Sequence, residues 1–209
     1  MNRLGVLRGS LAGQTVWVLG NGPSLQGVPK ERVPVERAVG VNRILRTHNV
    51  GYVVIVDPDV WAAEGKSVLA GGARLVVGEN LYWPLVRGHF PEERLVVFDW
   101  RASVVPGAGG DIIHKGCITG YYAAEIAAQM VAPGGRVILL GMDLAYPSSG
   151  NTHSYGDGRG EGASDAPFFR GIRAFRRLRE ALTGRVEFSV VGPSALLSEG
   201  FPSIGLDMA

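Results

Sequence analysis

The chain has 209 residues and a mass of 22.2 kDa, a length that suits a single domain with one sizeable core. Hydrophobic residues make up 46% and charged residues 19%, which excludes a disordered chain. The formal net charge of +2 gives no strong nucleic-acid signal. Because Cys117 is the one cysteine, an internal disulfide and a cysteine zinc cluster are both excluded. The start of the chain lacks a signal-peptide pattern and no apolar run approaches ~18 residues, so we expect a cytoplasmic protein without a membrane span.

Short apolar runs rich in β-branched residues recur along the chain and predict strands. They end at Gly or Asp in most cases, and their continuity is typical of strands buried on both faces, as in a parallel sheet. The predicted strands are Thr15–Leu19, Ala38–Val41, Tyr52–Val56, Ala73–Val77, Arg94–Phe98, Arg136–Leu140 and Val186–Val191.

Two helical patterns lie between these strands. Thr119–Val131 is rich in alanine and stops before Pro133. Ala166–Thr183 carries apolar residues at three-to-four spacing, with arginines on the other face and Asp165 as the expected N-cap. Strands that alternate with helices predict one doubly wound, mostly parallel α/β sheet over residues 1–209. The polar stretch Ala145–Ser164 predicts a long, flexible active-site loop.

The first candidate site is the turn that follows the first predicted strand. Its residues are Gly20, Asn21, Gly22, Pro23 and Ser24. Backbone N–H groups at such a strand end can face a phosphate, and glycines permit close approach. The pattern differs from the dinucleotide fingerprint and from the ATP-binding P-loop. The alternative is a tight strand-to-helix turn with no ligand.

Polar residues also follow the next two predicted strands. Asn42 comes after Ala38–Val41, and Asp57 comes after Tyr52–Val56. Ligands of open α/β sheets bind at the carboxyl ends of strands, so Asn21, Asn42 and Asp57 are expected to line one crevice. Asparagine offers both a donor and an acceptor to a base or sugar edge. Alternatively, each residue simply favours the turn in which it lies.

The strongest signal follows the strand Arg136–Leu140. Asp143, Tyr146, His153 and Tyr155 lie close together in the chain. Imidazole is the usual general base for a hydroxyl, and tyrosine hydroxyls can donate to a departing phosphate. The alternatives are a solvated loop histidine and a metal held by Asp143 and His153. Since the spacing matches no standard metal site, we predict no dedicated metal ion. A Mg²⁺ ion that arrives with a bound nucleotide is favoured over one held by the protein alone.

Several other residues have both a functional and a structural interpretation. Thr119 and Gly120 begin a helix, where a phosphate can bind. Cys117 stands just before it and is interpreted as a buried structural thiol. The phenylalanines of Ala166–Thr183 are interpreted as its buried face, and its arginines as a solvated stripe that could attract an anionic partner.

The motifs together resemble a known family in their order along the chain. Gly20–Leu25, Val41–Arg43 and Ile118–Gly120 resemble motifs of the bacterial CMP-sialic-acid-dependent sialyltransferases. Gly141–Leu144, His153–Gly156 and Gly192–Leu197 resemble the later motifs of the same family. The chain has Asp57 where those enzymes have Asn, and Gly120 where they have Ser.

A second, related resemblance fits other positions. The archaeal 6-hydroxymethylpterin diphosphokinases and the motility-associated glycosyltransferases share a similar opening, an Asp-Pro such as Asp57-Pro58, and a loop like Gly141–Tyr146 with Thr152-His153. These likenesses imply a Rossmann-like nucleotide-binding transferase domain. The first choice is a nucleotide-sugar-dependent glycosyltransferase, and the runner-up is a Mg-ATP-dependent diphosphotransferase. A non-catalytic nucleotide-binding module is the third reading.

The resemblance also implies a role for each site residue. Asn21–Ser24, Asn42 and Asp57 would hold the nucleotide, and Thr119 with Gly120 would contact it or its phosphate. Tyr146 and Tyr155 would stabilise the leaving phosphate, His153 would be the general base, and Asp143 would orient the loop or the donor. The expected ligands are a nucleotide-sugar donor, with a CMP-sugar favoured, and a hydroxyl-bearing acceptor, with no tightly bound cofactor. A homo-oligomer is compatible with the sequence.

Overall fold

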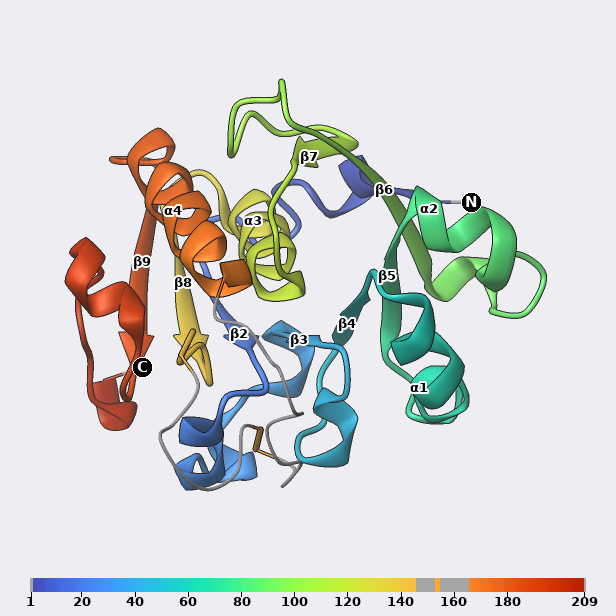
Figure 1. The fold of residues 1–209 in the computed structure, drawn as a ribbon, viewed down its shortest axis with the longest axis horizontal. Helices are drawn as coiled ribbons and strands as arrows, with labels where there is room; N and C mark the ends of the chain where they lie inside the picture. Colours follow the sequence, from blue (N-terminus) through green and yellow to red (C-terminus); the bar gives the residue numbers. More distant parts are fainter. Residues whose placement is uncertain (1, 146–152, 155–165, 209) are drawn as a thin grey trace.

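The apolar segments of the chain form one parallel sheet (Figure 1). The computed structural model describes residues 2–145, 153–154 and 166–208. Within this part of the chain the strand order is β1-β6-β5-β4-β3-β2-β8-β9, and β7 pairs with β6 beyond that path. The strands are β1 (Asn2–Arg3), β2 (Thr15–Leu19), β3 (Ala38–Val41), β4 (Tyr52–Ile55), β5 (Arg74–Gly78), β6 (Leu95–Arg101), β7 (Ile112–His114), β8 (Gly135–Leu140) and β9 (Val186–Val191).

The sheet is buried on both faces because side chains alternate along each strand. Val16 and Val18 of β2 pack into a cluster with helices α3 (Thr119–Val131) and α4 (Ala166–Ala181). Trp17 and Leu19 of the same strand pack into the opposite cluster with helix α1 (Pro58–Ala70). The continuous apolar runs therefore fill two hydrophobic layers, as a parallel sheet requires.

Helix α3 lies at the centre of the first layer, between the sheet and α4 (Figure 1). All its residues are buried, which explains why its sequence is rich in alanine and nearly free of charge. The other face carries α1, the short helix α2 (Glu79–Leu81) and the π-helical η6 (Tyr82–Val86). Short 3-10 turns are η1 (Leu4–Leu7), η2 (Pro23–Gly27), η3 (Lys30–Arg32), η4 (Val35–Arg37), η5 (Ile44–Arg46), η7 (Glu92–Arg94), η8 (Ala195–Glu199) and η9 (Leu206–Met208).

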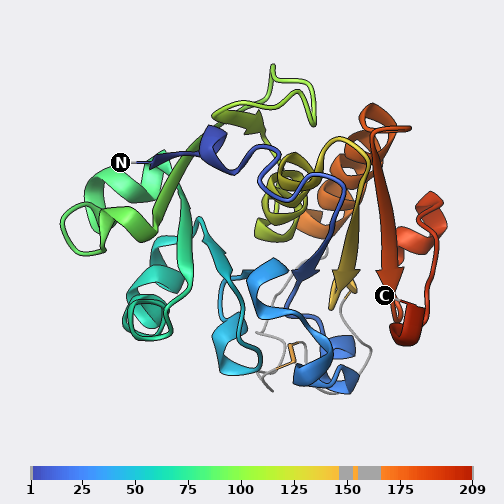
Figure 2. The ribbon, with the colours of Figure 1, turned by 180° about the vertical axis from the view of Figure 1, so that it is seen from behind.

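The segment after β1 runs from the β6 edge of the sheet to β2 in the middle (Figure 2). On its way this segment caps the carboxyl end of α3. The N–H groups of Gly9, Leu11 and Gly13 donate to the carbonyls of Gln129, Met130 and Val131. Carbonyls in the last turn of a helix have no partner within the helix. This segment therefore satisfies the carboxyl end of α3, opposite to the end that faces the candidate site.

The predicted doubly wound α/β sheet is confirmed. The strands 15–19, 38–41 and 186–191 and the helix 119–131 have the predicted bounds, and the other predicted elements shift by one to three residues. Helix α1 and strands β1 and β7 were not predicted. From β2 the chain builds outward through β3, β4, β5 and β6, and then returns to place β8 on the other side of β2. This reversal creates a topological switch point between β2 and β8, where ligands of such sheets bind.

Candidate functional site

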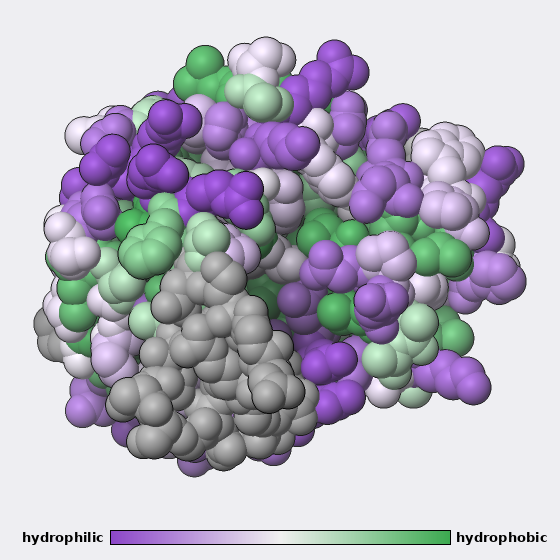
Figure 3. All heavy atoms as spheres, in the orientation of Figure 1, coloured by the Kyte–Doolittle hydropathy of each residue, from purple (hydrophilic) through white to green (hydrophobic). Residues whose placement is uncertain are grey.

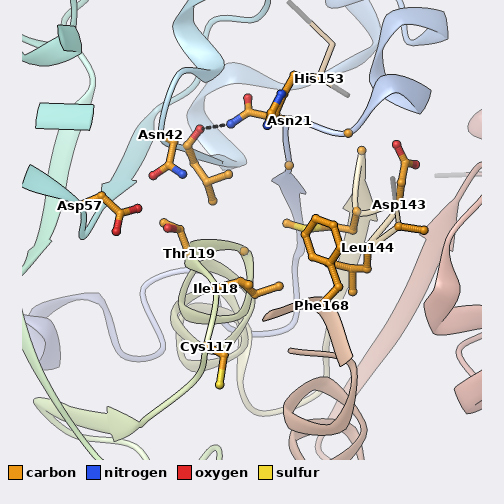
Figure 4. Close-up of a pocket in the computed structure, with 17 residues that line it drawn as sticks. Asn21, Asn42, Asp57, Cys117, Ile118, Thr119, Asp143, Leu144, His153 and Phe168 are labelled. Carbon is orange, nitrogen blue, oxygen red and sulfur yellow. Dashed lines mark hydrogen bonds between the residues drawn. The ribbon is translucent and has the colours of Figure 1, made fainter. Parts of the chain in front are cut away.

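A pocket of about 280 Å³ opens at the switch point. It lies at the carboxyl ends of β2, β3, β4 and β8 and at the amino end of α3 (Figure 4). Figure 3 shows a hollow beside the grey atoms, with hydrophobic residues at its floor. The predicted site residues that line the pocket are Gly20, Asn21, Gly22, Asn42, Asp57, Thr119, Gly120, Asp143 and His153.

The turn after β2 is held against the turn after β8. Gly22 donates its N–H to the carbonyl of Gly141 at 2.8 Å, and the N–H of Ser24 donates to Oδ2 of Asp143 at 3.0 Å. A Cβ at Gly20 would collide with the Gly141 carbonyl, and one at Gly22 with the Asp143 carboxylate. The glycines therefore permit contact between two strand ends. The expectation that this turn offers its N–H groups to a phosphate is wrong for Gly22 and Ser24, whose N–H groups are already used.

Asp143 fastens this turn from the β8 side. Its Oδ2 accepts from Ser24, while no described residue donates to its buried Oδ1. Burial raises the pKa of the Asp143 carboxyl, although the neighbouring Ser24 acts in the opposite direction. This contact ties Asp143 to the turn after β2, and its predicted role in orienting the loop that follows it, or the donor, stays a prediction. Pro23 and Ser24 line a neighbouring cavity, which also contains Asp143.

Two asparagines carry polar groups into the pocket. Nδ2 of Asn21 donates to the carbonyl of Val41 at 3.0 Å, which ties the end of β2 to the end of β3 (Figure 4). The side-chain oxygens of Asn21 and Asn42 are buried, and no hydrogen bond to them is formed within the described residues. Unpaired buried acceptors cost free energy, so both oxygens are suited to a ligand's N–H or O–H.

Backbone strain is concentrated at this pocket. Asn42 and Leu144 both have a φ of 52° and are the non-glycine residues with positive φ in the described part of the chain. Both line the pocket. Left-handed conformations are unfavourable for side chains with a Cβ, mildly for asparagine and more for leucine. Strained residues that gather at one cavity indicate a functional site.

Asp57 and Thr119 meet on one wall of the pocket (Figure 4). The Thr119 hydroxyl lies beside the Asp57 carboxylate. Partial removal from water raises the pKa of the Asp57 carboxyl, the neighbouring Thr119 side chain lowers it, and the charge of Asp59 raises it further. The carboxylate of Asp57 is thus a partly desolvated acceptor that faces the cavity.

Helix α3 points its amino end into the same space. Thr119 and Gly120 form its first turn, and no described hydrogen bond uses their N–H groups. These donors and the helix dipole favour a negatively charged group. A Cβ at Gly120 would crowd the sulfur of Met142, so a small residue here lets α3 approach the end of β8. Of the two segments that the sequence suggests for a phosphate, the start of α3 is therefore the one whose N–H groups are not used by other described residues.

His153 lies at the rim beside Asn21 (Figure 4). Its neighbour Ser154 donates its N–H to the carbonyl of Asn21 at 2.8 Å and accepts from Nε2 of Gln26 at 3.1 Å. These bonds place the imidazole next to the end of β2. Tyr146 and Tyr155, predicted to bind the leaving phosphate, and the predicted N-cap Asp165 lie outside the described residues.

One wall of the pocket is apolar, which the sequence did not predict. Phe168 of α4, with Ile118 and Leu144, closes the side opposite Asn42 and Asp57 (Figure 4). Of the phenylalanines expected on the buried face of α4, Phe175 is fully buried, Phe168 is half-buried at the pocket and Phe169 is 64% exposed. Helical spacing groups residues on a face, but it does not show where the helix projects beyond its neighbours.

The interpretation of Cys117 as a buried thiol is wrong. Cys117 is exposed and lines the pocket just before α3. The approach to α3 runs along the protein surface, so the apolar face of the helix begins only after this residue. Apart from its place before a helix, no signal in the sequence distinguishes this position.

Carboxylates, cysteine and histidines are dispersed in the described part of the chain. No group of three such side chains there could hold a metal ion. Asp57 and Asp143 lie on opposite sides of the pocket (Figure 4). Asp59 lies in the first turn of α1 and is exposed.

Comparisons with protein-family models, with curated proteins and with solved structures found no match to this chain. The likeness to sialyltransferases and diphosphokinases therefore rests on the short motifs alone. Among the helices of the described residues, none is long and apolar enough to cross a membrane.

Proposed function

We propose that the pocket binds a nucleotide and that the protein is a nucleotide-sugar-dependent glycosyltransferase. The observation that carries this proposal is the convergence, at the switch point, of unpaired asparagine oxygens, the open amino end of α3 and His153. Together they offer hydrogen-bond partners for a base or ribose, donors for a phosphate, and a base for a hydroxyl group.

Each part of the pocket has a place in this proposal. Asn21 and Asn42 accept from the nucleoside, and Asp57 accepts from a ribose hydroxyl. The first turn of α3 holds the phosphate. Phe168 and Ile118 give an apolar surface against which a ring can pack.

The chemistry is a displacement at the anomeric carbon of the donor sugar. His153 takes the proton from the acceptor hydroxyl, the acceptor oxygen bonds to the anomeric carbon, and the nucleotide phosphate leaves with the electrons of the broken bond. The dipole of α3 stabilises the charge that develops on the leaving phosphate. The roles of Tyr146 and Tyr155 as donors to that phosphate stay predictions from the resemblance.

The second candidate is a Mg-ATP-dependent diphosphotransferase. It is favoured by one observation, the proximity of the Asp57 carboxylate to the Thr119 hydroxyl at the amino end of α3. Carboxylate and hydroxyl oxygens suit Mg²⁺ when it arrives with a triphosphate. In that reaction the pocket would bind the phosphates of ATP in place of a sugar.

Thermal unfolding in the presence of nucleotides separates these candidates. CMP, UDP, GDP, ATP and their sugars are tested with and without Mg²⁺. A nucleotide at 100 times its Kd should stabilise the fold by about 2.7 kcal/mol, or roughly 5–10 °C in Tm. We expect a response to CMP or a CMP-sugar without Mg²⁺. A response to Mg-ATP alone would favour the diphosphotransferase, and no response at all would overturn nucleotide binding.

Asn42→Gly tests whether the binding uses this pocket. Glycine accepts the positive φ of Asn42 and removes only the amide, so the nucleotide response should fall while the fold is kept. Asn49→Ala changes an exposed asparagine nearby and is the matched control. Equal responses from the two variants would place the nucleotide elsewhere.

His153→Ala tests the general base once a donor and an acceptor are known. We expect kcat to fall by about 10²–10⁴ at unchanged donor binding, because proton transfer contributes that much. His89→Ala, at an exposed histidine, should leave turnover unchanged. A product that is still formed within about tenfold of the native rate would remove His153 from this role, and binding without any turnover would support the non-catalytic module.

A further inference from the structure

A second cavity, of about 250 Å³, lies beside the candidate site and is lined almost wholly by basic side chains. We name it the basic cavity. Its residues are His114, Lys115, Cys117, Arg170, Arg173, Ala174 and Arg177. In Figure 3, hydrophilic side chains gather over α4 in the upper left of the view. Among the residues that the structure describes, no acidic side chain lines this cavity.

The geometry of α4 brings the arginines together. Arg170, Arg173 and Arg177 are spaced by three and four residues, which places them along one side of the helix. The buried residues Phe175 and Leu178 anchor another side of α4 in the core. The arginine side therefore faces the segment that leads from β7 into α3, where His114, Lys115 and Cys117 lie.

The charges of the basic cavity are not neutralised by the protein residues that the structure describes. Arg170, Arg173 and Arg177 form no salt bridge there, whereas Arg176, on the same helix, pairs with Glu180 and Glu199. Like charges that share a concave surface repel one another, and a bound anion relieves that repulsion. Guanidinium groups also match the oxygens of phosphate and carboxylate with paired hydrogen bonds.

The basic cavity adjoins the candidate site through Cys117, which lines both. Figure 4 places Cys117 on the far side of Ile118 from Asn42 and Asp57. The proposed donor phosphate lies at Thr119, on the near side. An anion in the basic cavity is thus separate from the donor and close enough to belong to the molecule that reacts with it.

We propose that the basic cavity binds a phosphate group of the acceptor, so that the acceptor is a small phosphorylated molecule with a free hydroxyl. The assignment of that molecule as acceptor rests on the proposed glycosyl transfer. A cavity of this size suits a single phosphate with part of its carrier. A nucleic acid would instead need an extended row of basic residues, which a formal net charge of +2 does not favour.

Cys117 reports on the basic cavity directly, because it is the one cysteine of the chain. The rate of its reaction with a dianionic aromatic disulfide is compared with the rate for a neutral dipyridyl disulfide. Positive charge should accelerate the dianionic reagent selectively. We expect each of Arg173→Gln and Arg177→Gln to lower the ratio of the two rates by roughly threefold, and Arg176→Gln, at a paired arginine, to leave it unchanged.

Inorganic phosphate is then added as the probe, at constant ionic strength set with KCl so that general screening is held fixed. Phosphate should slow the dianionic reagent at Cys117 in the native protein and fail to do so in the Arg173→Gln, Arg177→Gln double variant. Acetate at the same concentration should protect less, because the proposal assigns a phosphate. No protection, equal protection of the double variant, or stronger protection by acetate or by an oligonucleotide would overturn the proposal.

The experiment separates the basic cavity from the proposed function. Phosphate protection at Cys117 without any nucleotide response would leave the anion site standing and remove the glycosyltransferase. A nucleotide response without phosphate protection would support the proposed nucleotide site and overturn the anion site. With an active donor in hand, the double variant should raise the KM of a phosphorylated acceptor at least tenfold and leave the donor KM unchanged, and an unchanged acceptor KM would contradict the assignment.

Discussion

At the scale of single residues, the candidate site depends on close contact between two strand ends. Gly22 has a φ of −64°, which any residue can adopt, so its lack of a side chain is required by the nearby Asp143 carboxylate and Gly141 carbonyl. Gly27, at the end of the same 3-10 turn, has open space around it. The two glycines therefore differ in steric environment, and one serves as the control for the other.

We predict that Gly22→Ala destabilises the protein by roughly 1–3 kcal/mol, the usual cost of forcing extra atoms into a packed region. Gly27→Ala should change the free energy of unfolding by less than about 0.5 kcal/mol. Urea unfolding of both variants measures this. If the two alanine variants prove equally stable, the contact between the ends of β2 and β8 is not rigid.

Single residues also mark where sequence reasoning reached its limit. Asn21, Asn42 and Asp57 could be placed together because the carboxyl ends of parallel strands share one edge of the sheet. Phe168 and Cys117 could not, because their exposure depends on where α4 and the approach to α3 end in space. The sequence also could not predict that the N–H groups of Gly22 and Ser24 donate to the turn after β8. These bonds depend on the register of two segments that are far apart in the chain.

At the scale of elements, α3 joins the site to the rest of the fold. Glu125, nearly two turns after the amino end of α3, is fully buried and accepts from the N–H groups of Gly107 at 2.9 Å and His114 at 3.2 Å. It therefore fastens the end of β7, and with it the wall of the basic cavity, to α3. Burial raises the pKa of this carboxyl above its ordinary value of 4.5, and the hydrogen bonds offset only part of the rise.

This pKa shift predicts a pH dependence of stability. The folded state binds the Glu125 proton more tightly than the unfolded state does, so the contribution of this group is most favourable below pH 4.5 and is lost as the pH rises through the raised pKa. Glu125→Gln keeps an acceptor oxygen and removes the titration. We expect the difference in unfolding free energy between native protein and variant to fall across this range, as followed by urea unfolding at several pH values.

A difference that stays constant with pH would contradict the raised pKa of Glu125. Glu125→Leu provides the complementary control, because it removes the acceptor altogether. Relative to Glu125→Gln, it should cost roughly 1–3 kcal/mol for each N–H left without a partner, at every pH.

The elements that the sequence predicted are those with a strong local pattern. The β-branched runs of β2, β3 and β9 and the alanine-rich α3 matched their predicted bounds. Helix α1 was missed because its apolar residues are few, although Asp57 and Pro58 stand where an N-cap and a first-turn proline are common. Strands β1 and β7 have two and three residues and exist only through pairing with β6, which no local signal encodes.

At the scale of the whole molecule, the sheet order assembles the site from segments that are distant in the chain. The ends of β2 and β8 are about 120 residues apart in sequence and lie side by side because the order in which strands join the sheet reverses at β2. The charge is distributed in the same way: the net charge is small, yet unpaired basic groups collect at one cavity. The candidate site therefore depends on the order of the strands in the sheet, and each local motif supplies only one part of it.

Topology also predicts how the whole molecule responds to a ligand. A nucleotide in the pocket touches the ends of β2, β3 and β8 and the first turn of α3 at once, and each of these segments opens less often when the bound state is stabilised. Hydrogen exchange followed by mass spectrometry, with the nucleotide that raises Tm, should show slower exchange at residues 20–22, 41–43, 118–121 and 141–144 together. The far edge, β1 and α2, should exchange as before, because it contacts the pocket only through the sheet. Protection confined to one of the four segments, or centred on the β6 edge, would mean that the ligand binds outside the switch point.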